Sequence, residues 1–364
     1  MDDVRRAADR LRILTLNAIS EAGLKLLPTD RYQIASDAIS PDAILVRSQN
    51  MHDMVIPASV RAIGRAGAGT NNIPVEAMSA RGIPVFNAPG ANANAVKELV
   101  IAGLLLAARN LVPAIRFVDG LRAPDDAALN VLVEENKKHY AGVELPGQTL
   151  GVLGLGRIGS LVADAAIKLG MDVLGYDPEI TVEAAWSLPS SVRKAHSIEE
   201  VLKTCDFVSV HVPLIAQTRH LVNAQRLALM QPGAVLLNFA RDEIVDANAV
   251  AEALTAKRLH YYVCDFPSAR LAGHPDVVAL PHLGASTREA EDNCAVMVAS
   301  QLRDYLEHGN IRHAVNFPDV VMERESPYRI GIANANVPNM LGQISTAVAN
   351  AGLNIHNMLN KSRR

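Results

Sequence analysis

Cysteine is scarce in this 364-residue chain, which contains only Cys205, Cys264 and Cys294. The three residues are far apart in the sequence and lack the paired spacing of metal ligands. They therefore indicate neither a disulfide framework nor a zinc or other metal site. No apolar segment of the signal-peptide type follows the arginines near the N-terminus. We therefore expect the protein to work in a reducing cytoplasm.

The chain also lacks an excess of charge of one sign and a long hydrophobic run. Its 35 basic and 38 acidic residues give a formal net charge of −3, so electrostatics offer no reason to expect nucleic acid as a partner. The most apolar run, 99–108, is about half the ~20 residues that a membrane crossing requires. We expect it to be a buried helix and expect no membrane association.

Alternating strand and helix patterns run through most of the sequence. Before about residue 90, strands are predicted at 13–16, 43–46, 62–65 and 83–87, and from residue 149 on at 149–153, 171–176, 207–210, 234–239, 261–265 and 277–279. Long helices are predicted at 95–109 and 285–307, and the polar segment 119–147 is expected to be irregular. This alternation, at a length suited to two or three domains, predicts an α/β protein with two doubly wound parallel sheets of the Rossmann-like type.

A glycine-rich turn carries the strongest functional signal. Gly154, Gly156 and Gly159 follow an apolar strand at the G-x-G-x-x-G spacing, and an amphipathic helix begins immediately afterwards. The first glycine permits a tight turn, the second lets the backbone approach a pyrophosphate, and the third allows close packing of helix on strand. The motif predicts a dinucleotide site, with the pyrophosphate on the N–H groups at the start of the helix.

An acidic residue at the end of the next strand selects between cofactors. Asp177 lies near the distance expected for the carboxylate that binds the adenosine ribose, and an acid there repels a 2′-phosphate. The sequence therefore predicts NAD rather than NADP.

Five segments in this order resemble those of the D-2-hydroxyacid dehydrogenases: RAGAGTNNIP (65–74), FNAPGANANAVKELV (86–100), the glycine-rich turn, NFARDEIVD (238–246) and PHLGAST (281–287). The resemblance implies a substrate-binding domain at 1–97 completed by 287–318, an NAD-binding Rossmann domain at 98–286, and a cleft between them. A linker is expected at 319–327. The resemblance also implies a homodimer or homotetramer, because the apolar helix 95–109 is suited to burial against a second subunit.

The catalytic residues implied by the resemblance stand after predicted strands. Arg241 would hold the substrate carboxylate and carbonyl oxygen with its planar guanidinium, and His282 would exchange the hydroxyl proton. The family also places a glutamate downstream of the arginine, but here positions 269 and 270 are alanine and arginine. Asp265, or a carboxylate from another segment, is our hypothesis for the partner of His282, although the resemblance also assigns Asp265 to the nicotinamide carboxamide.

Further binding residues follow from the same resemblance. Arg47 with Ser48, and Arg65 with the N–H groups of Ala68 and Gly69, would bind the substrate and its phosphate. Val212 and Pro213 would line the adenine side. The expected NAD-binding set is Gly154, Gly156, Arg157, Ile158, Gly159, Asp177, Val212, Pro213, Phe239, Ala240, Asp265, Gly284 and Ala285.

The C-terminal segment 328–364 resembles the first, β–α–β half of an ACT domain, a regulatory module that often binds amino acids. Asn334, Asn336 and Asn354 fall where related domains contact an effector, but asparagine is equally common in turns and helix caps. Both interpretations stay open.

The sequence favours one reaction and leaves two alternatives. The favoured reaction is NAD-dependent oxidation of 3-phosphoglycerate to 3-phosphohydroxypyruvate, which begins serine synthesis. One alternative is a reductase of hydroxypyruvate or glyoxylate, which lack a phosphate and do not need the arginine pair. The other is a non-catalytic NAD sensor of the corepressor type, which the missing glutamate would suit.

Overall fold

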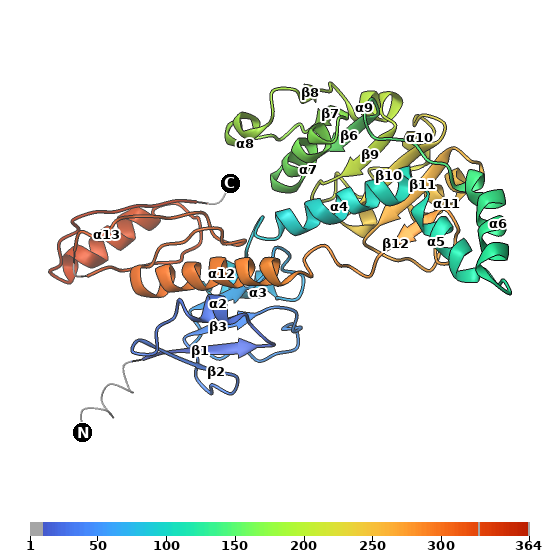
Figure 1. Ribbon diagram of the computed structural model, residues 1–364. Helices are drawn as coiled ribbons and strands as arrows, with labels where there is room; N and C mark the ends of the chain where they lie inside the picture. Colours follow the sequence, from blue (N-terminus) through green and yellow to red (C-terminus); the bar gives the residue numbers. More distant parts are fainter. Residues whose placement is uncertain (1–9, 327, 363–364) are drawn as a thin grey trace. The chain divides into compact units, whose positions relative to one another are not determined.

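The computed structural model describes residues 10–326 and 328–362 (Figure 1). It contains two compact units. Unit 1 combines the residues up to Asn92 with those from Thr287 onward, and unit 2 is Ala93–Ser286. The division thus falls just before the long helix α4 (Ala93–Ala108), about five residues ahead of the boundary expected after residue 97.

The core of unit 1 is a five-stranded parallel sheet in the order β2-β1-β3-β4-β5. Its strands are β1 (Leu11–Leu16), β2 (Tyr32–Ala35), β3 (Ala43–Val46), β4 (Ala62–Arg65) and β5 (Val85–Phe86). Helices α2 (Glu21–Leu24) and α12 (Arg288–His308) contribute to the apolar core on one face, and α3 (Val75–Ala80) contributes to the core on the other. The hydroxyl of Thr287 caps α12 by accepting from the N–H of Ala290 (3.1 Å), so the helix begins at Arg288 rather than at the predicted residue 285.

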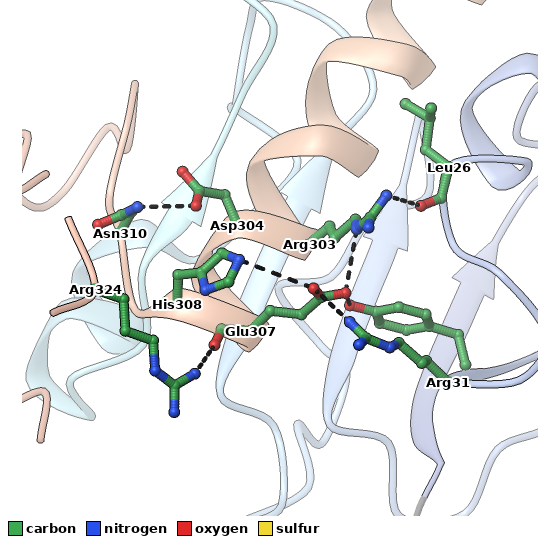
Figure 2. Close-up of polar contacts among 9 residues, drawn as sticks. Leu26, Arg31, Arg303, Asp304, Glu307, His308, Asn310 and Arg324 are labelled. Carbon is green, nitrogen blue, oxygen red and sulfur yellow. Dashed lines mark hydrogen bonds and ion pairs between the residues drawn. The ribbon is translucent and has the colours of Figure 1, made fainter. Parts of the chain in front are cut away.

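A polar cluster at the end of α12 fastens this helix to the β1–β2 side of unit 1 (Figure 2). The Glu307 carboxylate accepts from the Tyr32 hydroxyl (2.7 Å), from Arg303 (3.1 Å) and from Arg31 (2.9 Å). Burial alone would raise the pKa of Glu307, but the Tyr32 hydrogen bond and the arginine charges bring it below its ordinary value. Arg324 donates to the Glu307 carbonyl (3.3 Å), so the predicted linker is also attached here.

The core of unit 2 is a seven-stranded parallel sheet in the order β12-β11-β10-β9-β6-β7-β8. Its strands are β6 (Thr149–Leu153), β7 (Asp172–Tyr176), β8 (Arg193–Lys194), β9 (Phe207–Val210), β10 (Ala234–Asn238), β11 (Leu259–Cys264) and β12 (Val277–Ala279). Successive strand residues alternate between two apolar layers, as in β10, where Val235 and Leu237 face one layer and Leu236 faces the other. A sheet buried on both faces explains why these strands read as continuous apolar runs.

Helices cover both faces of this sheet. Residues of α4 and α7 (Arg157–Lys168) fill one apolar layer, and residues of α9 (Ile198–Thr204), α10 (Ala224–Leu227) and α11 (Ala247–Thr255) fill the other. The remaining helical segments are α5 (Leu111–Gly120), α6 (Asp126–Asn136), α8 (Val182–Ser187) and the short 3-10 turns Lys137–Tyr140 and Asp242–Ile244. Among the described residues no single helix has the length and apolar character to cross a membrane; α4 and α5 meet those criteria only together, as a pair bent by 66°.

The segment 119–147 is more regular than predicted, because it contains α6. The side chain of Asp125 caps this helix by accepting from the N–H of Ala128 (2.8 Å). No residue of α6 is buried, and the polar residues at its two ends and at Asn130 made the segment read as a surface loop. The prediction of an irregular segment was wrong for this reason.

The C-terminal segment departs from the predicted β–α–β pattern. From residue 328 to residue 362 the chain forms helix α13 (Met340–Asn350) but no strand, and none of these residues is buried. A pair of strands around a single helix buries too little apolar surface to be stable alone. This accounts for the helix without its flanking strands.

Candidate active site

The turn between β6 and α7 fits a dinucleotide. Gly154 has a positive φ of 93°, and a Cβ on it would lie 2.8 Å from the carbonyl of His211. A Cβ on Gly159 would lie 1.9 Å from the Gly154 carbonyl oxygen, whereas a Cβ on Gly156 would meet no atom within 4 Å. The turn is therefore tightly packed on its protein side and open at Gly156, beside the free N–H groups that begin α7 at Arg157 and Ile158.

Asp177 follows β7 and hydrogen-bonds to the backbone of this turn. Its carboxylate accepts from the N–H of Leu155, inside the glycine-rich turn (2.8 Å), and from the N–H of Glu179 (3.0 Å). A carboxylate oxygen has more than one lone pair, so these two bonds leave acceptor capacity for a hydroxyl pair. The predicted contact with a ribose stays a prediction.

The other predicted cofactor residues of unit 2 also follow strand ends. Val212 and Pro213 come after β9, Phe239 and Ala240 after β10, and Gly284 and Ala285 after β12. Because all seven strands are parallel, their carboxyl ends lie at one edge of the sheet, where ligands of open α/β sheets bind. The close approach of His211 to Gly154 places the start of the 212–213 segment beside the glycine-rich turn.

Arg241 and His282 lie at the same edge, after β10 and β12. These two strands flank β11, so with a strand spacing of ~4.8 Å their ends are about 10 Å apart. Arg241 is exposed, and its guanidinium donates to the Ala240 carbonyl (2.6 Å). The fully buried Asn238 donates to the carbonyl of Arg241 (2.9 Å) and accepts from the N–H of Ala240 (3.2 Å), which fixes the backbone that carries the arginine. Sequence reasoning missed this role of Asn238.

Asp265, at the end of the intervening β11, has partners other than the His282 ring. Its two carboxylate oxygens accept from the N–H groups of Leu283 and Gly284, both at 2.7 Å, and its carbonyl accepts from the N–H of His282 (3.1 Å). His282 has a positive φ of 58°, and its ring contacts that of Phe266 with centroids 5.0 Å apart. Within unit 2, all of whose backbone the structure describes, no carboxylate hydrogen-bonds to this imidazole. The hypothesis that Asp265 pairs with the ring is therefore not supported, and Asp265 instead orders the backbone that carries it.

The positions of the missing glutamate offer no substitute acid. Ala269 and Arg270 are both exposed. Asp276, the other carboxylate between Asp265 and His282, forms an ion pair with Lys257 at 2.9 Å.

The predicted substrate residues of unit 1 gather at the carboxyl edge of its sheet. Arg47 and Ser48 follow β3, and Arg65 ends the neighbouring β4, where Val46 and Arg65 are register partners. A Cβ on Gly67 would lie 1.6 Å from Nη1 of Arg65, so the guanidinium folds back over this glycine. Ala68 and Gly69 continue the same loop. The structure thus brings the two arginines together within unit 1.

Three asparagines that sequence reasoning missed hold these loops. Asn17, which follows β1, accepts from the N–H groups of Ser48 (3.1 Å) and Gln49 (2.6 Å). Asn72 donates to the carbonyl of Gln49 (2.8 Å), and Asn87 donates to that of Ala68 (2.6 Å). Asn17 also has a positive φ of 68°, which asparagine tolerates better than most residues. An asparagine directly after an apolar strand was the one available signal.

A carboxylate from α12 reaches the same edge. Glu291 accepts from Nη2 of Arg47 at 2.5 Å, and both side chains are only partly exposed. The two residues are 244 positions apart in the sequence. No local pattern could have indicated this pair.

The candidate effector residues lie at the surface, and their contact with an effector stays a prediction. Asn334, Asn336 and Asn354 are all exposed, and Asn334 donates to the carbonyl of Ala335 (2.9 Å). Across the described ranges, no three His, Cys, Asp or Glu side chains come together as a metal ion would require.

Comparison with known proteins agrees with this geometry. Residues 101–284 match the NAD binding domain of the D-isomer specific 2-hydroxyacid dehydrogenases. The chain is 34% identical over 358 residues to the D-3-phosphoglycerate dehydrogenase of Methanocaldococcus jannaschii, covering 95% of this chain and 64% of that one. It is 34% identical over 305 residues to the enzyme of the same name from Escherichia coli, covering 81% and 70%.

A solved structure has the same fold. The NAD⁺-bound 3-phosphoglycerate dehydrogenase of Entamoeba histolytica superposes with a TM-score of 0.66 at 26% identity, covering 84% of this chain and 98% of that one. With a family match across half the chain and relatives above 30% identity, this chain belongs to the D-isomer-specific 2-hydroxyacid dehydrogenases, whose NAD-binding domain it carries in unit 2.

Proposed function

We propose that the protein oxidises 3-phospho-D-glycerate to 3-phosphohydroxypyruvate, the activity of a D-3-phosphoglycerate dehydrogenase and the first step of serine synthesis. The observation that carries this choice is the arginine pair of unit 1, Arg47 and Arg65, at adjoining strand ends. Guanidinium groups bind phosphate through charge-assisted hydrogen bonds, and a substrate without phosphate would not need two of them. The names of the curated relatives support the same substrate.

The residues of unit 2 would supply the rest of the chemistry. The glycine-rich turn would hold NAD, and the bound nicotinamide would supply the acceptor for the substrate's hydride. Arg241 holds the carboxylate and the oxygen that becomes a carbonyl, and its exposure leaves the guanidinium accessible to an anion. His282 removes the hydroxyl proton. The bonds from Asp265 to the backbone of residues 283 and 284 fix the turn on which the imidazole stands.

A non-catalytic NAD sensor is the second candidate, and one observation favours it. No described carboxylate of unit 2 bonds to the His282 imidazole, and positions 269 and 270 offer none. A sensor would bind NAD without transferring hydride. Absorbance of the reduced cofactor during incubation with substrate separates the two functions, because only an enzyme changes it.

Substrate choice is tested with one variant and one control. We expect the wild type to reduce 3-phosphohydroxypyruvate with a much lower KM than hydroxypyruvate. Arg47→Ala should raise the KM for the phosphorylated substrate by about 10- to 100-fold, because a charged hydrogen bond contributes roughly 1.5–3 kcal/mol, and should leave that for hydroxypyruvate nearly unchanged. Arg61→Ala, which removes an arginine paired with Asp42 at 3.2 Å, is the matched control. Equal KM values for both substrates would instead support a hydroxypyruvate or glyoxylate reductase.

Assembly, location and regulation complete the proposal. We propose a homodimer or homotetramer, because α5 and α6 leave apolar side chains such as Ile115 and Val131 more than half exposed. Light scattering of the purified protein measures the number of subunits directly.

A cytoplasmic location is proposed from the three free cysteines. An amino-acid effector is proposed at the C-terminal segment from its resemblance to an ACT domain.

A further inference from the structure

Glu291 occupies an unexpected position beside the arginine pair of unit 1. It stands in the first turn of α12, and its Oε1 accepts from Nη2 of Arg47 at 2.5 Å. The exposed fractions of the two side chains are 37% and 39%, so both can be reached by a ligand. Among the described residues the Arg47 guanidinium makes no other hydrogen bond, which leaves several of its five N–H donors available.

A neighbouring thiol shows that the charges of this cluster lie close together. Cys294 is one turn further along α12 and is buried. Burial raises its pKa, the charges of Arg65 and Arg47 lower it, and the charge of Glu291 raises it. Both arginines and Glu291 therefore lie within electrostatic reach of one sulfur atom.

We propose that Glu291 is a specificity-determining residue, which sets the affinity of the unit 1 anion site for a phosphate group by neutralising the charge of Arg47. The inference rests on the proposed phosphate-binding role of this site. A phosphate monoester carries about −1.5 to −2 charges at neutral pH. A carboxylate in contact with Arg47 repels such a group and lowers the positive potential that attracts it. The phosphate must share Arg47 with Glu291 or displace it, so binding is moderate and release is easy.

An alternative role for Glu291 is purely structural, to hold the Arg47 side chain and its loop in place. The surrounding contacts argue against this role. The backbone beside Arg47 is already fixed by Asn17, through the N–H groups of Ser48 and Gln49, and by Asn72, through the carbonyl of Gln49. The acidic residue is not needed to shape this loop. If it served only to orient the side chain, a neutral acceptor in the same place would be sufficient.

Glu291→Gln separates charge from geometry, because glutamine keeps an acceptor oxygen and loses only the charge. Glu289→Gln is the matched control: it makes the same change in the same helical turn, at a carboxylate paired with Arg288 at 3.3 Å and 72% exposed. The first measurement is binding of inorganic phosphate, by titration calorimetry at fixed ionic strength. The second is the KM for 3-phosphoglycerate.

We expect Glu291→Gln to bind phosphate about three- to tenfold more tightly than the wild type, the range for loss of a partly exposed charge interaction. Glu289→Gln should bind like the wild type. In an Arg47→Ala background, Glu291→Gln should have less than half of this effect. Unchanged or weaker phosphate binding by Glu291→Gln would overturn the inference. Because phosphate binding needs no turnover, tighter binding in a protein that does not oxidise 3-phosphoglycerate would support the inference while refuting the proposed reaction.

Discussion

Two glycines of the dinucleotide turn should respond to substitution by alanine in different ways. A Cβ on Gly156 would enter open space, whereas a Cβ on Gly159 would lie 1.9 Å from the Gly154 carbonyl oxygen. The space beside Gly156 is where we expect the pyrophosphate of NAD to approach the backbone. Gly156→Ala should therefore reduce NAD binding with little effect on folding, and Gly159→Ala should reduce folding stability.

The magnitudes follow from these contacts. Gly156 has φ −68° and ψ −163°, which alanine adopts without strain, so the free energy of unfolding should change by at most about 1 kcal/mol. Displacing the pyrophosphate from the N–H groups of the turn loses one or two charged hydrogen bonds, which raises the Kd for NAD by roughly 10- to 1000-fold. At Gly159 the rigid carbonyl must move by about 1 Å, at a cost of roughly 1–3 kcal/mol, or about 3–10 °C in Tm.

Thermal unfolding with and without NAD measures both effects in one assay, because a ligand that binds the native state raises Tm. Gly156→Ala should unfold at the wild-type temperature without NAD and lose most of the rise with NAD. Gly159→Ala should unfold early in both conditions. A Gly156→Ala variant that keeps the full rise would refute our assignment of the open space to the cofactor.

Two further predictions concern His211 and Gly67. His211 is half-buried as a residue, but its Nδ1 is fully shielded and has no partner, and burial lowers its pKa to about 4. Because the unfolded histidine binds its proton near pH 6.5, the free energy of unfolding falls between pH 6.5 and 4. In urea titrations over this range, His211→Gln should lose about 3 kcal/mol less of this free energy than the wild type or the exposed control His139→Gln. Parallel curves for the three proteins would contradict this. Gly67→Ala should displace the Arg65 guanidinium and raise the KM for 3-phosphoglycerate about tenfold, whereas the control Gly331→Ala, whose Cβ would meet no atom within 4 Å, should leave it unchanged. An unchanged KM in Gly67→Ala would argue against a phosphate contact by Arg65.

The strands with a continuous apolar run were predictable because each is specified by its own residues. In β3 and β9 every residue is buried, and both strands have the predicted bounds, as do β4, β6 and β12. A continuous apolar run followed by a polar residue or a glycine indicates a buried parallel strand without knowledge of its neighbours.

Two of the four edge strands, β2 and β8, were not predictable in this way, whereas the edge strands β5 and β12 were. β2 is mostly part-exposed and β8 is two exposed residues, Arg193 and Lys194, so neither has the continuous apolar run of the predicted strands. Their strand conformation depends on a partner formed by another part of the chain. The same dependence explains the missing strands around α13, for which the described residues provide no partner.

The candidate site likewise has residues that local sequence could predict and contacts that it could not. Arg47, Arg241 and His282 could be placed at strand ends, because a motif directly after an apolar run is local information. Their partners could not, since they depend on which strands become neighbours. The position of β11 between β10 and β12 brings Asp265 under the turn after β12, and the positive φ of His282 directs the N–H groups of the next two residues onto the carboxylate.

This geometry has a consequence for catalysis. A carboxylate that accepts two backbone N–H bonds at 2.7 Å cannot turn toward the imidazole without losing both bonds and leaving the buried N–H of Gly284 unpaired, which costs about 1–3 kcal/mol. Asp265 is therefore committed to the backbone. Within unit 2 the orientation of His282 depends on that backbone and on the ring of Phe266, so the proposed reaction would use an imidazole that unit 2 positions by packing rather than by an acid.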